Sequence, residues 1–291
     1  MVTMRPAIQL YSLREMDEPL PEILRQVAAA GFEGVEFADR VHDADTAAVA
    51  EALAETGLEP VGAHVSLSDL EHSEPELLEQ YDAIGCRTLV VPHLSSSSIR
   101  TARRLDELGD RLDRVAKRLA EDGFEVSYHN QYQDFTRPVA SRVVSGFIDA
   151  SAVPVAGEYG VELVYNGVKD AVRNPSLDGT KFGRLAAGTD PSLVSFEVDV
   201  GWVTAAGFDP DAVLDALDHP VWSLHLNDVA EEEGEYASTR PGSGIVDFEA
   251  AATTARRHGV EWLVYEHDDP ADPAATIEHG ADAVIPLTVE N

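Results

Sequence analysis

The chain has 291 residues and a hydrophobic content of 44%, which is enough for one large core. Its 53 acidic residues outnumber its 21 Lys and Arg residues and give a formal net charge of −32 at pH 7. This charge argues against a nucleic-acid partner, because duplex binding depends on cationic side chains that neutralise phosphates. Molar salt shortens the Debye length to about 3 Å, so the composition predicts a halophilic, salt-adapted organism.

No run of about 18 or more apolar residues is present, so we expect no membrane partner and no membrane-spanning helix. The first ten residues alternate like a strand and do not form a charged and then apolar leader, which favours a cytoplasmic location. The single cysteine, Cys86, excludes an internal disulfide and a thiolate-rich zinc site. Any bound metal is therefore expected to use oxygen and imidazole ligands.

Strand-like segments alternate with helical segments along the chain. The strand-like segments are residues 7–13, 34–38, 60–67, 88–94, 125–130, 194–202, 221–228 and 262–268. The first four intervals between them carry apolar residues at a spacing of three to four and end at or beside glycine, which is typical of amphipathic helices. Parallel strands require crossover connections, so eight such units predict an α/β protein with a (β/α)₈ TIM barrel as a single domain over residues 1–291.

The interval between the fifth and sixth strands, residues 135–190, is too long for a plain loop. We expect it to hold an insertion over the barrel mouth, together with the fifth helix near Lys181–Ala187. The insertion could act as a lid, and a surface decoration or an oligomer contact explains it equally well.

Three polar side chains, Asp199, His225 and Glu266, lie where strands six, seven and eight run out. Catalytic groups in a TIM barrel lie at these carboxyl ends, and the alternation of side chains puts Glu197 on the same face as Asp199. His267 falls on the opposite face of its strand and is expected to be a structural or a surface residue. Two carboxylates and an imidazole suit Mn²⁺, Mg²⁺, Co²⁺ or Zn²⁺. The sequence therefore predicts a site for one divalent metal ion.

A fourth ligand is expected from the end of strand five, in the segment YHNQYQDF. His129 and Asn130 end this strand, and Asp134 follows shortly after them. We favour Asp134 as the ligand.

Six segments, IQLYSLR, GVEFA, YHN, DVGWVTAAGFDP, HLND and YEHDDP, follow one another in this order along nearly the whole chain. With them the chain resembles the sugar phosphate isomerase/epimerase superfamily. These xylose isomerase-like TIM barrels include inosose dehydratases, ketose 3-epimerases, hydroxypyruvate isomerases and the endonuclease IV group. DVGW, HLND and the Glu of strand eight are the specific part of the resemblance.

The resemblance implies one divalent ion held by Glu, Asp, His and Glu from strands five to eight. The last three ligands correspond to Asp199, His225 and Glu266. Members commonly carry an HNH segment followed by Glu-Phe, whereas this chain has Gln131 in place of the second His and Asp134 in place of the Glu. The resemblance thus implies Asp134 as the fourth metal ligand, with Asp134 and Glu266 as the catalytic acid and base.

The implied function is that of an isomerase or epimerase of carbohydrate metabolism, which moves a proton next to the carbonyl of a sugar, sugar phosphate or cyclitol. An inosose-type dehydratase on the same site is one alternative. A non-catalytic relative that has lost the metal site is another, and the charge disfavours a metal-dependent endonuclease. The expected partner is a small carbohydrate or cyclitol, and the resemblance is compatible with a homo-oligomer that covers the barrel mouth.

Further side chains are expected to surround the ion. The candidate substrate contacts are Glu36, His64, His93, His129, Trp202 and Arg240. Arg240 is followed by PGSG after strand seven, where TIM barrels often bind phosphate, although an ordinary turn explains these glycines equally well. Asn227 and Asp228 are expected either to orient His225 or to cap the next helix.

Overall fold

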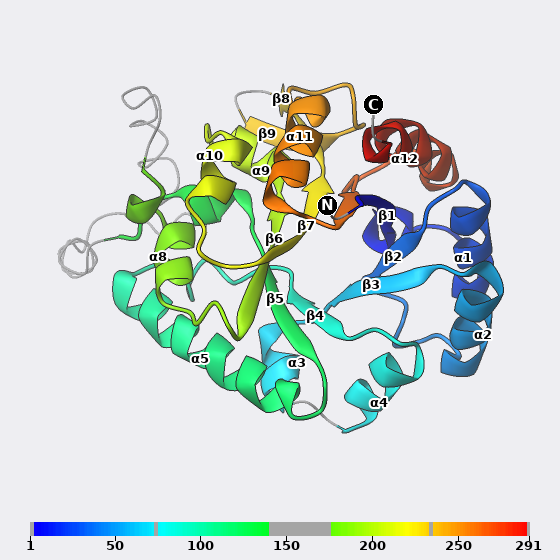
Figure 1. Ribbon diagram of the computed structural model, residues 1–291, viewed down its shortest axis with the longest axis horizontal. Helices are drawn as coiled ribbons and strands as arrows, with labels where there is room; N and C mark the ends of the chain where they lie inside the picture. The colour runs from blue at the N-terminus through cyan, green and yellow to red at the C-terminus, as the bar shows by residue number, and fades with distance from the viewer. Residues whose placement is uncertain (1–2, 73–74, 140–175, 233–234, 290–291) are drawn as a thin grey trace, which may run out of the picture.

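Parallel strands close into a barrel with helices arranged around it (Figure 1). The structure is a computed structural model and describes residues 3–72, 75–139, 176–232 and 235–289. The barrel strands are β1 Arg5–Gln9, β2 Gly34–Phe37, β3 Glu59–His64, β4 Thr88–Val91, β5 Glu125–His129, β6 Val194–Asp199, β7 Val221–Leu226 and β10 Trp262–Tyr265. Their order around the barrel is β1-β10-β7-β6-β5-β4-β3-β2, which confirms the predicted (β/α)₈ fold.

Helices connect successive strands on the outside of the barrel. They are α1 Leu20–Ala29, α2 Thr46–Thr56, α3 Leu67–His72, α4 Pro75–Ala83, α5 Ala102–Ala120, α8 Lys181–Ala187, α9 Val200–Ala205, α10 Pro210–Asp215, α11 Phe248–His258 and α12 Pro273–Thr288. Short 3₁₀ helices are η1 Leu10–Leu13, η2 Tyr132–Phe135 and η5 Leu177–Gly179, and an antiparallel hairpin joins β8 Asp228–Glu232 to β9 Glu235–Thr239. Helix α8 begins and ends where the fifth helix was predicted. The predicted lid falls largely on residues 140–175, outside the described residues.

Two barrel strands end earlier than the sequence suggests, because their last side chains cap the helix that follows. The Gln9 side chain accepts a hydrogen bond from the Tyr11 amide, and the Asp199 carboxylate accepts one from the Trp202 amide. Within the DVGW segment, Asp199 is therefore the last residue of β6, and the residues after it begin α9. This cap fixes Asp199 at the carboxyl end of the barrel.

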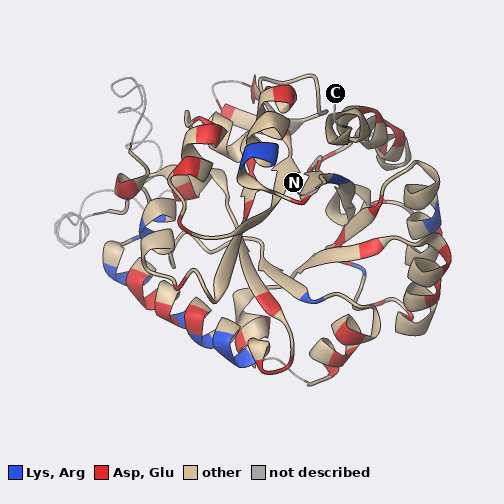
Figure 2. Ribbon diagram, in the orientation of Figure 1, with Lys and Arg blue, Asp and Glu red and all other residues tan. Residues whose placement is uncertain are grey.

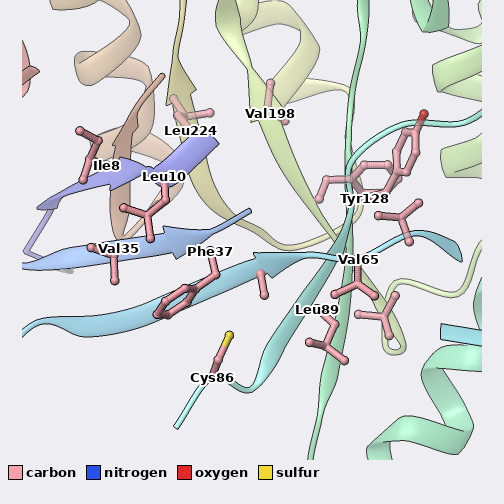
Figure 3. Packing of buried hydrophobic residues seen from close by; sticks show 14 of the residues in the cluster. Ile8, Leu10, Val35, Phe37, Val65, Cys86, Leu89, Tyr128, Val198 and Leu224 are labelled. Atoms are coloured by element: carbon pink, nitrogen blue, oxygen red, sulfur yellow. The ribbon is translucent and has the colours of Figure 1, made fainter. Parts of the chain in front are cut away.

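Two apolar groups build the core. Side chains that point outward from the strands, among them Val35, Phe37 and Leu89, pack beneath the helices (Figure 3). A smaller group fills the amino-terminal part of the barrel interior and consists of Ala7, Val61, Trp262 and Val264 with the partly buried Trp222. The remaining inward positions nearer the carboxyl ends of the strands are polar, which is where a site is expected in this fold.

Glycines make room for this interior packing. A Cβ atom on Gly34 would lie 2.6 Å from both the Trp262 ring and Val61 Cγ1. A Cβ atom on Gly62 would lie 2.8 Å from Glu36 Oε1 and 3.0 Å from the Trp222 ring. The barrel interior around Glu36 is thus filled by neighbouring side chains.

Charged residues lie mainly on the outer helices, and α5 carries residues of both signs along its length (Figure 2). Its buried face carries five large apolar residues, Leu105, Leu108, Leu112, Val115 and Leu119. Among the described residues, no helix has the length and the apolar composition that crossing a bilayer would require.

Candidate metal centre

Four buried side chains meet at the carboxyl ends of β5, β6, β7 and β10. We call His129, Asp199, His225 and Glu266 the mouth cluster, because their ligand atoms all lie within 4.8 Å of one another at the rim of the barrel. His225 Nδ1 lies 2.7 Å from Glu266 Oε2, and His129 Nε2 lies 4.0 Å from Asp199 Oδ2. None of the four is more than 5% exposed.

The pairing register of the strands explains why the side chains of the mouth cluster lie together. Asp199 on β6 pairs with His225 on β7, and Val264 on β10 pairs with the same histidine. Glu266 lies two residues beyond Val264, so it points to the same side as His225. The inward orientation that alternation predicted for these residues is the one found.

The carboxylate of Asp199 is fixed from several sides. The Trp202 amide donates to Oδ1 over 2.8 Å, and Asn227 Nδ2 donates to Oδ2 over 3.2 Å. Ser238 Oγ donates to Asn227 Oδ1 in turn, over 2.8 Å. The Asn130 amide bonds both the backbone N–H and the C=O of Asp199. Such support holds the carboxylate in one orientation, as is usual for side chains that bind metals.

A second group lies deeper in the barrel. We call His64, Glu197, His129 and His225, together with the adjacent Glu36, the inner cluster; the ligand atoms of the first four lie within 4.8 Å of one another. Glu197 precedes Asp199 by two positions on the same face of β6, which places it one step further inside. The mouth and inner clusters share the imidazoles of His129 and His225.

Glu197 is the centre of the inner cluster. Its Oε1 lies 3.0 Å from His129 Nδ1, 3.0 Å from His225 Nε2 and 3.2 Å from His64 Nε2. Ser223 Oγ donates to the other oxygen, Oε2, over 2.7 Å.

Several buried carboxyl groups surround these imidazoles. Burial, reinforced by the charge of Glu266, raises the pKa of Asp199 to about 7, and burial, reinforced by Glu197, raises the pKa of Glu36 to about 7. Burial alone would lower the pKa of His225, but Glu197, Glu36 and Glu266 together raise it well above the usual value. A cation is what this arrangement attracts.

The donor set also fits a divalent ion chemically. The mouth cluster combines two carboxylates with two imidazoles, a set that suits Mn²⁺, Co²⁺ or Zn²⁺. Among the described residues, every ion pair of the Glu266, Glu197 and Glu36 carboxylates is with a histidine ring. His225 Nε2 is buried and makes no hydrogen bond of acceptable geometry.

The structure does not bring Asp134 into either cluster. Its Oδ2 accepts hydrogen bonds from the Tyr128 hydroxyl over 2.7 Å and from the backbone N–H of Gln131 over 2.8 Å. Tyr128 points outward from β5 into the apolar core, where its ring meets Phe196 at 6.1 Å. Asp134 in η2 follows it there, so the predicted role of Asp134 as ligand and acid or base is corrected: His129 occupies the corresponding place in the cluster.

The candidate substrate contacts separate into two groups. Glu36 and His64 lie in the inner cluster, not on the rim, and His129 belongs to both clusters. Trp202 is partly buried at the start of α9. The side chains of His93 and Arg240 are exposed and belong to neither cluster.

Neither expected partner of His225 plays that role. Asn227 supports Asp199, as described above. Asp228 is fully buried and accepts the amides of Val229, Gly242, Gly244 and Val246 over 2.7 to 3.1 Å. Because the two glycine amides are taken by this carboxylate, they are not free to bind a phosphate as the PGSG segment had suggested.

Sequence reasoning missed the importance of three side chains. Glu197 centres the inner cluster, Ser223 holds it, and the Gln9 amide donates to Glu36 Oε2. The signal for Glu197 and Ser223 was their parity, since each lies two residues before a predicted ligand on the same strand face. Gln9 ends β1 and pairs with Glu36 in the register of β1 and β2, which no pattern within one strand reveals.

No protein-family model matches the chain, and no curated protein matches its sequence. Solved structures do match it over nearly its whole length. A sugar phosphate isomerase/epimerase from Parabacteroides distasonis is 17% identical, with a TM-score of 0.72 over 99% of this chain and 96% of that one. The chain has the fold of the xylose isomerase-like TIM barrels.

Two further solved structures share this fold. A probable 3-DHS dehydratase from Bacillus anthracis is 12% identical, with a TM-score of 0.64 over 97% of this chain and 99% of that one. The IolI protein, solved with a zinc atom, is 12% identical, with a TM-score of 0.61 over 98% of both chains. At these identities the likeness shows the fold alone.

Proposed function

We propose that the protein is a divalent-metal-dependent enzyme that transfers a proton next to the carbonyl group of a sugar, sugar phosphate or cyclitol. The observation that carries this proposal is the mouth cluster, in which two carboxylates and two imidazoles converge at the carboxyl-terminal end of the barrel strands, where active sites lie in this fold. Structural neighbours that include a sugar phosphate isomerase/epimerase and a zinc-containing IolI protein support it.

Asp199, His225 and Glu266 would hold the ion, with the His129 ring on the fourth side. Three protein ligands are typical of catalytic sites, because they leave positions for oxygens of the substrate. When bound, a divalent ion acts as a Lewis acid that polarises a carbonyl oxygen and so acidifies the adjacent C–H bond.

The residues of the chain supply the remaining steps. Burial would raise the pKa of Glu266, but the charge of His225 outweighs burial and lowers it, so this carboxylate is ionised at neutral pH, the form in which a general base accepts a proton. The Asp268 carboxyl lies two residues further along, close enough that burial and the charges of Glu266 and Asp199 raise its pKa to about 8.

A dehydratase is the second candidate. Dehydration begins with the same proton abstraction and then releases hydroxide from the neighbouring carbon, so the same site serves both reactions. The structural likeness to a probable 3-DHS dehydratase favours keeping it. The two reactions differ in product mass, because dehydration removes one water.

Solvent exchange tests the proposal. The protein is incubated in D₂O containing molar KCl and Mn²⁺ with ketoses, their phosphates and cyclitol ketones, and products are followed by NMR and mass spectrometry. We expect deuterium next to the carbonyl of at least one compound, lost after treatment with EDTA and restored by Mn²⁺. Metal-loaded protein that exchanges no proton in any compound would favour a non-catalytic barrel instead.

A further inference from the structure

Five donor groups converge in the inner cluster. Their donor atoms are separated from one another by distances typical of two ligands on the same metal ion. His64 Nε2 lies 3.2 Å from Glu197 Oε1 and 3.4 Å from Glu36 Oε2, and His129 Nδ1 lies 3.0 Å from Glu197 Oε1. Donor atoms around a tetrahedral zinc ion, each 2.0 to 2.1 Å from the metal, lie about 3.3 Å apart. The donor atoms of the inner cluster are therefore already spaced as ligands.

The inner cluster also holds polar atoms that its own side chains leave unpaired. Glu36 and Glu197 are both fully buried, and their Oε2 and Oε1 atoms converge on one atom, His225 Nε2, at 2.8 and 3.0 Å. Glu36 Oε1 and His225 Nε2 are buried without a hydrogen-bond partner. Two buried carboxylates repel each other unless a positive charge lies between them.

We propose that the inner cluster is a second divalent-cation site, separate from the mouth site on which the proposed function rests. Its ligands are His64 Nε2, His129 Nδ1 and Glu197 Oε1, with the carboxylate of Glu36 as the fourth. The ion adds two positive charges to a space enclosed by two buried carboxylates. It thereby removes their repulsion.

The two sites divide the shared imidazoles between them. A neutral imidazole has one free lone pair and one N–H. His225 turns Nδ1 to Glu266 in the mouth and Nε2 to Glu36, so Nδ1 would bind the mouth ion, and the Nε2–H, which makes no hydrogen bond of acceptable geometry, is directed at the inner carboxylates. His129 turns Nδ1 to Glu197 and Nε2 towards Asp199, so it binds the inner ion. Each site then keeps a complete ligand set.

The inner donor set favours zinc over magnesium. Two imidazoles with carboxylates suit Zn²⁺, whereas Mg²⁺ prefers oxygen ligands and retains several waters. Supporting contacts are already present, since Ser223 donates to Glu197 and Gln9 donates to Glu36. An inner zinc ion would hold the His129 ring and the Glu36 carboxylate that positions His225, and so stiffen the floor beneath the mouth site.

Zinc counting tests the inner site directly. Protein stripped with a chelator in molar KCl is loaded with ZnCl₂, gel-filtered and analysed for elements. We expect about two zinc ions per chain in the wild type and about one in His64→Gln, which removes one imidazole ligand of the inner site. His72→Ala, which removes an exposed histidine on α3, should retain two and controls for surface binding.

A second pair of variants separates the two sites. Glu197→Gln keeps the shape of the side chain and should lose the inner ion alone, whereas Asp199→Asn combined with Glu266→Gln should lose the mouth ion alone. A wild type with one zinc ion, or His64→Gln and Glu197→Gln proteins that are folded by circular dichroism and retain two, would overturn the inner site. Retention of two by the mouth variant, with loss in the inner variants, would contradict the mouth site and leave the inner site standing.

Discussion

Replacement of Glu266 by glutamine should slow solvent exchange into the substrate by about 10³-fold, because a positioned general base contributes roughly 10² to 10⁴. Glutamine has the same shape as glutamate but cannot accept the proton. It also removes a negative ligand that lies 2.7 Å from His225 Nδ1, so Mn²⁺ binding at the mouth should weaken. Exchange rates in D₂O and calorimetric Mn²⁺ titration measure the two effects.

Asp134→Asn is the matched control for metal binding. Like Glu266→Gln, it neutralises a buried carboxylate, but this carboxylate lies just after β5 and outside the mouth cluster. Its carboxylate contacts Tyr128 and Gln131, so we expect Mn²⁺ affinity within about threefold of the wild type, a change below about 0.7 kcal/mol. Loss of Mn²⁺ in Asp134→Asn with normal binding in Glu266→Gln would restore the ligand assignment suggested by the family resemblance.

Asp228→Ala should lower the free energy of unfolding by about 3 to 5 kcal/mol, because the buried carboxylate accepts four backbone amides and hydrogen bonds to a charged group contribute about 1.5 to 3 kcal/mol each. Solvent entering the space would satisfy some of the released amides, so the total is less than the sum. Urea unfolding in molar KCl, followed by circular dichroism, measures the loss.

Asp247→Ala controls for the removal of one negative charge from the same region. Asp247 caps α11 through one exposed hydrogen bond, 3.0 Å long, to the Ala250 amide. Its loss should cost about 1 kcal/mol, as is usual for a helix cap. If the two variants unfold at the same urea concentration, Asp228 does not organise the segment that follows β7 in the way its contacts indicate.

Hydrophobic periodicity was sufficient to predict the barrel. Each strand core is short, apolar and followed by a helix, and closure of the sheet follows from eight such units. The hairpin of β8 and β9 was missed because its segment, with Glu231 and Glu232 and few apolar residues, resembles a surface loop. Strand ends were also overextended, since a capping side chain such as Asp199 ends β6 through a contact that hydropathy does not record.

The candidate site was predictable where it depends on strand parity. Asp199, His225 and Glu266 follow from alternation and from the position of strand ends, and the structure brings them together. Asp134 could not be placed this way, because it lies after β5 in a 3₁₀ helix, where alternation no longer applies, and its carboxylate accepts a hydrogen bond from the Tyr128 hydroxyl. The inner cluster could not be predicted from the sequence for another reason. Glu36 meets His225 across the barrel interior, and their strands are not neighbours in the sheet.

A crystal grown with MnCl₂ and measured at the manganese absorption edge tests the proposed metal dependence most directly. We expect an anomalous peak at bonding distance from Asp199, His225 and Glu266, absent from crystals of the Asp199→Asn, Glu266→Gln double variant. No peak at the mouth of a well-ordered wild-type crystal, with manganese in excess, would contradict a metal-dependent enzyme and favour a barrel that has lost its catalytic ion.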